Sequence, residues 1–153
     1  ALAVSRDREV GVDVEHLSVR NVSLGIAHRF FSPREVRDLA EVPDHAQQHR
    51  FFEYWTFKES YIKARGMGLS LPLDGFSFEL PHENAVRIRI DPALEDRDER
   101  WAFWQYRPSP EYLLALCAER AGDRLPAVKM RTCVPFGEAC DVTMPLLRRS
   151  HED

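Results

Sequence analysis

The hydrophobic pattern of the chain changes from a helical to an alternating period at Gly66, and this change constrains the fold more than any other feature. Residues 44–65 have the spacing of one long amphipathic helix, which Asp44 can cap and Gly66 ends. Beyond it, the segments GFSFEL (75–80) and AVRIRI (85–90) alternate apolar and polar residues, as half-buried strands do. Helices followed by strands predict an α+β fold in which helices pack on one face of a mainly antiparallel sheet.

The N-terminal region has two shorter patterns. The β-prone runs ALAV (1–4) and VGVDV (10–14) flank a polar stretch, so we expect them to form a hairpin. A cap at Asn21 or Ser23 predicts a short helix that runs through Phe30.

The tetrapeptide Ser-Pro-Arg-Glu at 32–35 predicts the start of a second helix. Ser32 is a preferred cap, Pro33 suits the first helical position, and Glu35 lies where it completes a capping box. The helix is expected to end near Glu41. Glu35 therefore has a structural role that needs no ligand.

The second half of the chain is expected to add two more strands and a tail. WAFWQYRP (101–108) and YLLALCAER (112–120) are β-prone segments on either side of a short turn. No clear period follows, so the tail is expected to be loop or loosely attached. The chain is accordingly divided into one domain at 1–120 and a tail of uncertain structure at 121–153.

Composition and charge exclude several functional classes. The 153 residues are enough for one domain with a real core. The formal net charge of −4 is the opposite of the basic excess typical of general nucleic-acid binders. No apolar run reaches the roughly 20 residues of a membrane-spanning helix. We therefore expect neither nucleic acid nor membrane as a partner.

The three cysteines indicate a reducing compartment. Their spacing matches neither a zinc ribbon nor the disulfide framework of a secreted protein. We expect reduced thiols in a cytoplasmic protein, with Cys117 in the core. A disulfide between Cys133 and Cys140 is the less favoured alternative.

Two acids in the pentapeptide GVDVE (11–15) are the first candidate for chemistry. In a strand, Asp13 and Glu15 share one face and lie roughly 7 Å apart at the Cα level. Two such carboxylates repel each other unless a cation lies between them, and oxygen ligands suit Mg²⁺. An ordinary solvated strand face is the alternative interpretation.

A second candidate lies in the long helix. Glu59 and Lys63 are four residues apart with the acid first, so they share a helix face. A surface ion pair is the simplest interpretation of this spacing. Trp55 and Ile62 flank the pair, however, and a carboxylate at such a boundary needs a cation, either Lys63 or a metal.

Taken together, the motifs resemble those of a known family. The strand GVDVE (11–15) is followed after about forty residues by WTFKESYIK (55–63), which runs on into ARGMGLSLPL (64–73). The segments RFFSPREV (29–36) and FSFEL (76–80) also fit. This combination resembles the 4′-phosphopantetheinyl transferase superfamily, most closely the second half of its Sfp-type members, over about residues 1–120.

The resemblance implies a transferase. Such enzymes move the 4′-phosphopantetheine group of coenzyme A to a serine of an apo acyl or peptidyl carrier protein in fatty acid, polyketide or nonribosomal peptide synthesis. It implies that Asp13, Glu15 and Glu59 hold Mg²⁺, or alternatively Mn²⁺, against the pyrophosphate. Lys63 would contact the phosphates and stabilise developing charge, and Lys58 resembles a second phosphate contact.

The chemistry agrees with these roles, because phosphoryl-type transfer depends mainly on positioning and on neutralised charge. The serine proton needs an acceptor. Glu59 and a water on the metal are both candidates, and the sequence does not choose between them.

The match to only the second half of Sfp-type enzymes leaves alternatives open. We expect a fragment of a longer protein that lacks the first half of the coenzyme pocket; self-association of identical chains is a further alternative. A non-catalytic half that binds carrier protein or coenzyme A and needs a partner chain is the main alternative function. An unrelated Mg²⁺ phosphohydrolase is a weaker one.

Overall fold

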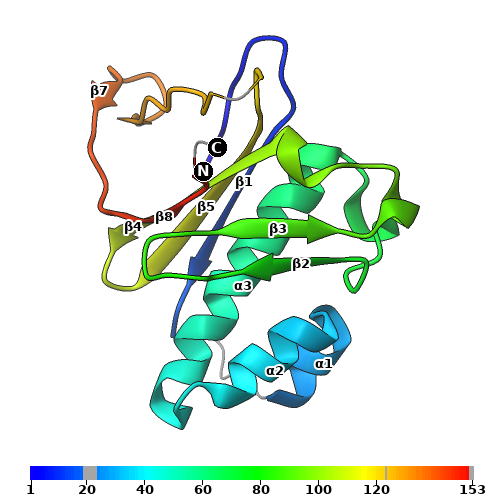
Figure 1. Ribbon diagram of the computed structural model, residues 1–153. Coiled ribbons are helices and arrows are strands. Elements are labelled where there is room, and N and C mark those ends of the chain that lie inside the picture. Colours follow the sequence, from blue (N-terminus) through cyan, green and yellow to red (C-terminus); the bar gives the residue numbers. More distant parts are fainter. Residues whose placement is uncertain (19–23, 123, 152–153) are drawn as a thin grey trace.

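The computed structural model describes residues 1–18, 24–122 and 124–151. A four-stranded antiparallel sheet is its main element, with the strand order β1-β5-β4-β8 (Figure 1). Its strands are β1 (Val10–His16), β4 (Trp101–Ser109), β5 (Tyr112–Glu119) and β8 (Leu146–Arg149). The α+β fold expected from the sequence is confirmed.

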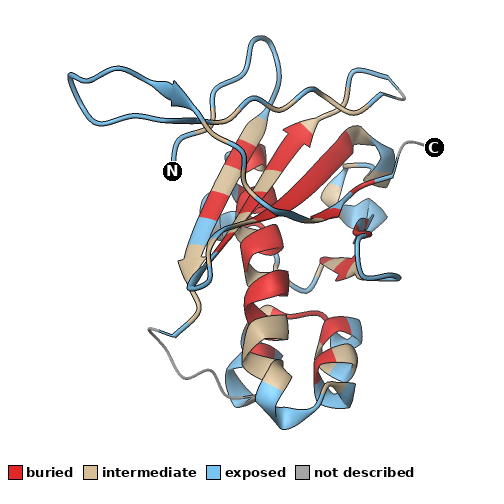
Figure 2. Cartoon of the chain, turned by 90° about the vertical axis from the view of Figure 1, so that its left-hand side faces the viewer, coloured by how far each residue is buried: buried red, intermediate tan, exposed pale blue. Residues whose placement is uncertain are grey.

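The long helix α3 (Asp44–Arg65) crosses one face of this sheet (Figure 1). Most of its residues from Phe51 onward are buried, including polar ones, because other elements cover the side turned away from the sheet (Figure 2). The covering elements are α1 (Leu24–Phe30), α2 (Pro33–Glu41) and the antiparallel ribbon of β2 (Phe76–Glu79) and β3 (Arg87–Ile90).

Aromatic rings fill the space between helix, ribbon and sheet. Phe57 of α3 stacks on Phe78 of β2 at 5.2 Å between ring centroids, and Phe78 meets Phe103 of β4 edge to face at 4.9 Å. The first two strands after the helix, β2 and β3, present their apolar alternate positions to this one core, as the alternation predicts. They form a separate two-stranded sheet, however, and do not extend the main one.

The helix ends follow the local sequence with one exception. Ser32 and Glu35 form the expected capping box, and Gly66 ends α3 in the left-handed conformation at φ 63°. The prediction that Asp44 caps α3 is wrong: the cap position is Pro43, no side chain caps the helix, and Asp44 is its first residue. The predicted cap of α1 at positions 21–23 lies outside the described residues.

Two other expectations are corrected. Residues 1–4 form no strand, so β1 pairs with β5 and not with an N-terminal hairpin partner. The tail is not loose in its last part, because β8 is the edge strand of the main sheet beside β4. The short ladder of β6 (Arg131–Thr132) and β7 (Cys140–Asp141) precedes it.

The tail also covers the sheet face opposite α3. Trp104 and Tyr106 of β4 are buried there. The tail residues that pack against this second, smaller core are Leu125, Val128, Met130 and Met144. Because both faces of the sheet are covered, β4 is buried along most of its length, which explains its continuous aromatic and apolar sequence.

Two further expectations concern the cysteines and membrane-spanning helices. Cys117 is buried in the core, and Cys133 and Cys140 are both free thiols on the surface, so the alternative disulfide is absent. Among the described residues, no helix combines the length and the apolar character that crossing a membrane requires.

Candidate active site

The candidate site lies where β1 packs directly on α3, and Gly11 makes this contact close. A Cβ atom at Gly11 would lie 2.1 Å from the backbone oxygen of Ser60 and 2.4 Å from the backbone nitrogen of Ala64. Only glycine permits two backbones to approach so closely. This contact brings the acids of β1 beside the helical turn that holds Glu59 and Lys63.

Asp13 is the most enclosed of the three predicted carboxylates. Its Oδ1 accepts a hydrogen bond from Nζ of Lys63 at 2.7 Å, while its Oδ2 is buried and has no hydrogen-bond partner among the described residues. Burial raises the pKa of the Asp13 carboxyl, against the opposing effect of Lys63. A hydrogen-bond donor or a cation next to this buried oxygen would therefore stabilise it.

Glu15 lies on the same face of β1, two residues farther along. Its Oε1 accepts a hydrogen bond from Nε1 of Trp55 in α3, at 3.1 Å. The expectation that Asp13 and Glu15 share one strand face holds, and the face is the one that α3 covers. The solvated outer face that we considered as an alternative is excluded.

Glu59 is half-buried, and the charges of Asp13 and Glu15 act on its carboxyl group. Burial raises the pKa of the Glu59 carboxyl, the negative charges of Asp13 and Glu15 raise it further, and the ammonium of Lys63 acts in the opposite direction. The three predicted carboxylates are thus electrostatically coupled across the β1–α3 contact. Lys63 is the cation that balances them.

The carboxylates fit a hard cation by chemistry, but they do not form a closed metal centre. Oxygen donors, mutual repulsion and the orphaned Oδ2 of Asp13 are the features that favour Mg²⁺. Within the part of the chain that the structure describes, no three His, Cys, Asp or Glu side chains are grouped closely enough to hold a metal ion.

Lys63 is well placed to meet a ligand. Its side chain is 48% exposed, while its ammonium is held by Asp13 at 2.7 Å. A lysine that is anchored on one side and open to solvent on the other suits an incoming anionic group. The expected i,i+4 surface pair with Glu59 is replaced by this longer-range pair with Asp13.

Lys58 lies elsewhere. Its side chain has no exposed surface, and its ammonium contacts the backbone oxygens of Leu73 and Phe76 at 2.6 and 2.8 Å and the carboxylate of Glu35 at 3.0 Å. All three N–H donors are therefore occupied within the core. The expectation that Lys58 contacts the coenzyme phosphates has no support in this arrangement, and we assign Lys58 a structural role.

Glu35 is the partner of Lys58, and it has more contacts than a capping box requires. It accepts hydrogen bonds from the backbone nitrogens of Ser32 and Phe78, both at 2.8 Å. The structural role expected for Glu35 is confirmed. The additional bond to Phe78 ties the start of α2 to β2.

Two contributors to the site were not recognised from the sequence. Gly11 was seen only as part of a motif, although a glycine next to alternating strand residues is a sign of close backbone approach. Trp55 was seen only as an apolar flank, although a buried indole N–H generally finds an acceptor. Its acceptor is Glu15, a residue of the candidate site.

Comparison with known proteins finds a matching family model and several relatives. Residues 9–117 match the family model of the 4′-phosphopantetheinyl transferase superfamily. A "4′-phosphopantetheinyl transferase ffp" of Bacillus subtilis is 41% identical over 111 residues, which are 72% of this chain and 47% of that protein. The "4′-phosphopantetheinyl transferase Sfp" of Bacillus subtilis (strain 168) is 39% identical over 109 residues, 71% of this chain and 46% of that protein.

A third relative matches a larger share of the chain than these two. It is a Bacillus subtilis "4′-phosphopantetheinyl transferase" that is 40% identical over 126 residues, 82% of this chain and 53% of that protein. The chain thus spans about half the length of the curated relatives it matches. The resemblance read from GVDVE and WTFKESYIK is confirmed over most of the chain, and the chain belongs to the 4′-phosphopantetheinyl transferase superfamily.

Proposed function

We propose that the protein transfers the 4′-phosphopantetheine group of coenzyme A to a serine hydroxyl of an apo acyl or peptidyl carrier protein. One observation supports this most directly: Asp13, Glu59 and Lys63 come together across the β1–α3 contact in a chain of this superfamily. Coenzyme A and the carrier protein are the two substrates.

In the proposed reaction the serine Oγ attacks the phosphorus that bears the pantetheine arm. A new O–P bond forms, the P–O bond to the nucleotide breaks, and 3′,5′-ADP leaves. Glu59 accepts the serine proton, because its carboxylate lies half-buried at the β1–α3 contact beside Asp13 and Lys63. The half-exposed Lys63 binds the phosphates and stabilises the charge that develops on the leaving group.

Mg²⁺, or Mn²⁺ in its place, would be held by Asp13, Glu15 and Glu59, whose side chains would have to move closer together than the described structure has them. When bound, the ion neutralises the pyrophosphate and polarises it for attack. The buried, unpartnered Oδ2 of Asp13 supports this assignment. Free thiols at Cys117, Cys133 and Cys140 support a cytoplasmic location, where thiols stay reduced.

Mass spectrometry of the carrier protein tests the proposal. Incubation of the protein with coenzyme A, Mg²⁺ and an apo carrier protein should add one phosphopantetheine to the carrier. Asp13→Asn should abolish the gain, and the matched control Asp141→Asn, at an exposed ion pair with Lys129, should keep it. Absence of any mass gain of the carrier protein would refute the proposal.

The half-length match favours a second candidate: a non-catalytic half that binds carrier protein or coenzyme A and needs a partner chain or a first half for catalysis. In that case the carrier would bind without modification. Binding measured by isothermal titration calorimetry would be the same for Asp13→Ala as for the wild type.

A further inference from the structure

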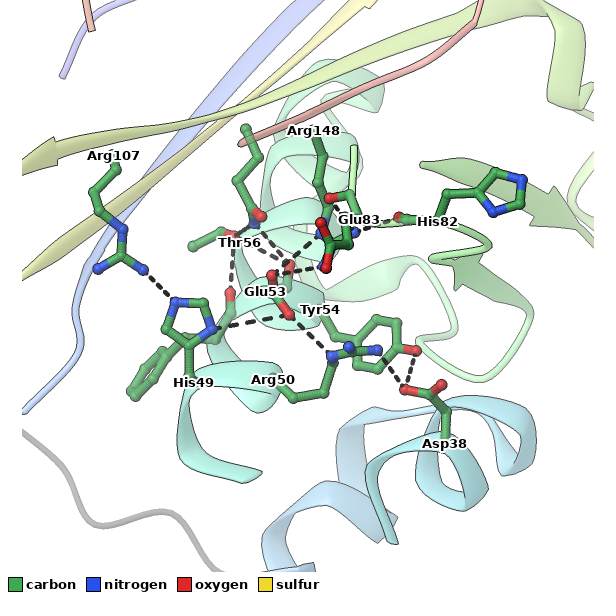
Figure 3. Close-up of polar contacts among 12 residues, drawn as sticks. Asp38, His49, Arg50, Glu53, Tyr54, Thr56, His82, Glu83, Arg107 and Arg148 are labelled. Carbon is green, nitrogen blue, oxygen red and sulfur yellow. Dashed lines mark hydrogen bonds and ion pairs between the residues drawn. The ribbon is translucent and has the colours of Figure 1, made fainter. Parts of the chain in front are cut away.

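Arg148 is a tail residue whose side chain reaches helix α3. It lies on β8, beyond the residues 9–117 that match the superfamily. Its Nε and Nη2 contact Oε1 of Glu53 at 3.2 and 3.1 Å, and its Nη1 donates to the backbone oxygens of His82 and Glu83 at 2.7 and 2.8 Å (Figure 3). Both charged side chains of the pair are about nine-tenths buried.

A neighbouring strand strengthens the same attachment. Gln105 of β4 pairs in register with Arg148, and its Nε2 donates to the backbone oxygen of Glu53 and to Oγ1 of Thr56 at 3.2 and 2.9 Å. Arg50 holds the second oxygen of Glu53 at 2.9 Å (Figure 3). This part of α3 is therefore fixed to β4 and β8 by directional bonds as well as by apolar packing.

Strand β1, at the other edge of the sheet, holds the opposite flank of the helix. Lys63 binds Asp13 and Trp55 binds Glu15, both across the β1–α3 contact. The helix is thus tied to both edges of the four-stranded sheet, with the candidate site on the β1 edge and the Arg148 cluster on the β8 edge.

The helical repeat links the two edges. Glu53 and Glu59 are six residues apart, so their side chains point about 120° apart around the helix axis. A rotation of α3 that relaxed the Glu53 contacts would therefore also swing Glu59 relative to β1. The buried ion pair and its hydrogen bonds are directional, so they favour one orientation of this side of α3.

We propose that Arg148 is a positioning residue: by fixing the rotation of α3 through Glu53, it sets the direction of Glu59 toward Asp13 and Glu15. The catalytic consequence depends on the proposed transferase function. The geometric consequence does not, because it concerns only the orientation of α3 against β1.

The first test follows the indole N–H signal of Trp55 in a ¹H–¹⁵N NMR spectrum, assigned with Trp55→Phe. Arg148→Met removes the guanidinium and keeps a long apolar side chain, while Arg50 still pairs with Glu53. We expect the Trp55 signal to shift in this variant. Arg131→Met is the matched control, because Arg131 lies in the same tail and its side chain pairs with Asp141 at the surface, so this variant should leave the signal in place.

The second test separates positioning from stability by kinetics at a temperature where all variants are folded. Arg148→Met should lower kcat roughly 10- to 100-fold with the KM for coenzyme A within about twofold, because a small misplacement of a catalytic group acts on the transition state. The double variant Glu53→Met/Arg148→Met leaves no buried charge of this pair unpaired, so it should recover melting temperature but keep the low kcat.

The outcomes distinguish the two proposals. An unmoved Trp55 signal in folded Arg148→Met would overturn the positioning role, and so would a kcat equal to that of the wild type. A double variant that regains both stability and kcat would also overturn it, because the pair would then serve stability alone. A wild-type protein without transferase activity would refute the proposed function, while the NMR result would still decide the orientation of α3.

Discussion

At the scale of single residues, the candidate site places three carboxylates and one lysine at positions that are partly shielded from solvent. Asp13 has one oxygen on Lys63 and one buried oxygen without a partner, and Glu59 lies near two further carboxylates. Such an arrangement is unfavourable for the folded protein alone, because repulsion and desolvation both act against it. Residues kept in this state are typical of functional sites.

Glu59→Gln should therefore separate stability from activity. The change removes one of three neighbouring negative charges, so the melting temperature should stay the same or rise. Loss of the proposed proton acceptor should lower the transfer rate by about 10²- to 10⁴-fold. Circular dichroism and a carrier-protein transfer assay measure the two effects.

The control for this variant is Glu41→Gln, at an exposed position of α2. It should change neither the melting temperature nor the rate. A Glu59→Gln protein with wild-type activity would exclude Glu59 as the proton acceptor.

Lys58→Met tests the structural role that we assign to Lys58. The substitution leaves the buried carboxylate of Glu35 without its cation and two carbonyl oxygens without a donor. The free energy of unfolding should fall by about 3–5 kcal/mol, measured by urea denaturation. The control Lys129→Met breaks an exposed pair with Asp141 and should cost no more than about 1 kcal/mol.

A different result for Lys58→Met would instead support the phosphate contact that the family resemblance implies for Lys58. Unchanged stability together with a strongly raised KM for coenzyme A would mean that Lys58 binds phosphate, in a conformation other than the one described.

At the scale of elements, the contact between β1 and α3 determines the site. Strand β1 is the edge strand beside β5, and its glycine allows the backbone of α3 to lie directly on it. The two motifs, separated by some forty residues, meet because of this contact. A larger residue at Gly11 would push the acids of the strand away from the helix.

Gly11→Ala is the corresponding prediction. The new methyl group would overlap backbone atoms of Ser60 and Ala64, which have no side-chain freedom to yield. We expect the free energy of unfolding to fall by at least about 3 kcal/mol, at the upper end of overpacking effects. Thermal unfolding followed by circular dichroism gives the measurement.

Gly75→Ala is the matched control, since the atoms nearest to its methyl group would belong to the flexible side chain of Leu94, at 3.2 Å and beyond. Its effect should stay below about 1 kcal/mol. Equal effects of the two substitutions would contradict a special role for the β1–α3 contact.

At the scale of the whole molecule, Asp96 joins parts of the chain that are distant in sequence. It accepts hydrogen bonds from Tyr61 and Arg65 of α3 at 2.7 and 2.6 Å, and from Nε1 of Trp101 of β4 at 2.8 Å. Burial alone would raise the pKa of Asp96, but bonds from Tyr61, Trp101 and the backbone nitrogen of Arg97, with the charge of Arg65, outweigh it and lower the pKa.

This lowered pKa predicts a specific loss of stability in acid. Because the folded state favours the charged form, the contribution of Asp96 is present above the pKa of an unfolded aspartate, about 3.9, and disappears as the pH falls through the lower folded pKa. Asp96→Asn should be less stable than the wild type at pH 7, and the difference should shrink below pH 4. Urea denaturation across this range measures it, and a difference that stays constant with pH would contradict the prediction.

The sequence alone determined the features that depend on local geometry. The capping box at Ser32, the αL end at Gly66 and the alternation in β2 and β3 follow from neighbouring residues, and so they were predictable. The shared face of Asp13 and Glu15 follows from the strand period in the same way. The family was also predictable, since its motifs are short and continuous.

Only the tertiary structure decided the features that depend on which surfaces meet. The burial of Lys58, the pairing of Lys63 with Asp13 and the reach of Arg148 to Glu53 join residues 23 to 95 positions apart, such as Lys58 with Glu35. A local pattern fixes the direction of a side chain relative to its own helix or strand. It does not fix the partner that the fold brings to that side chain, because that choice is made by the packing of the whole core.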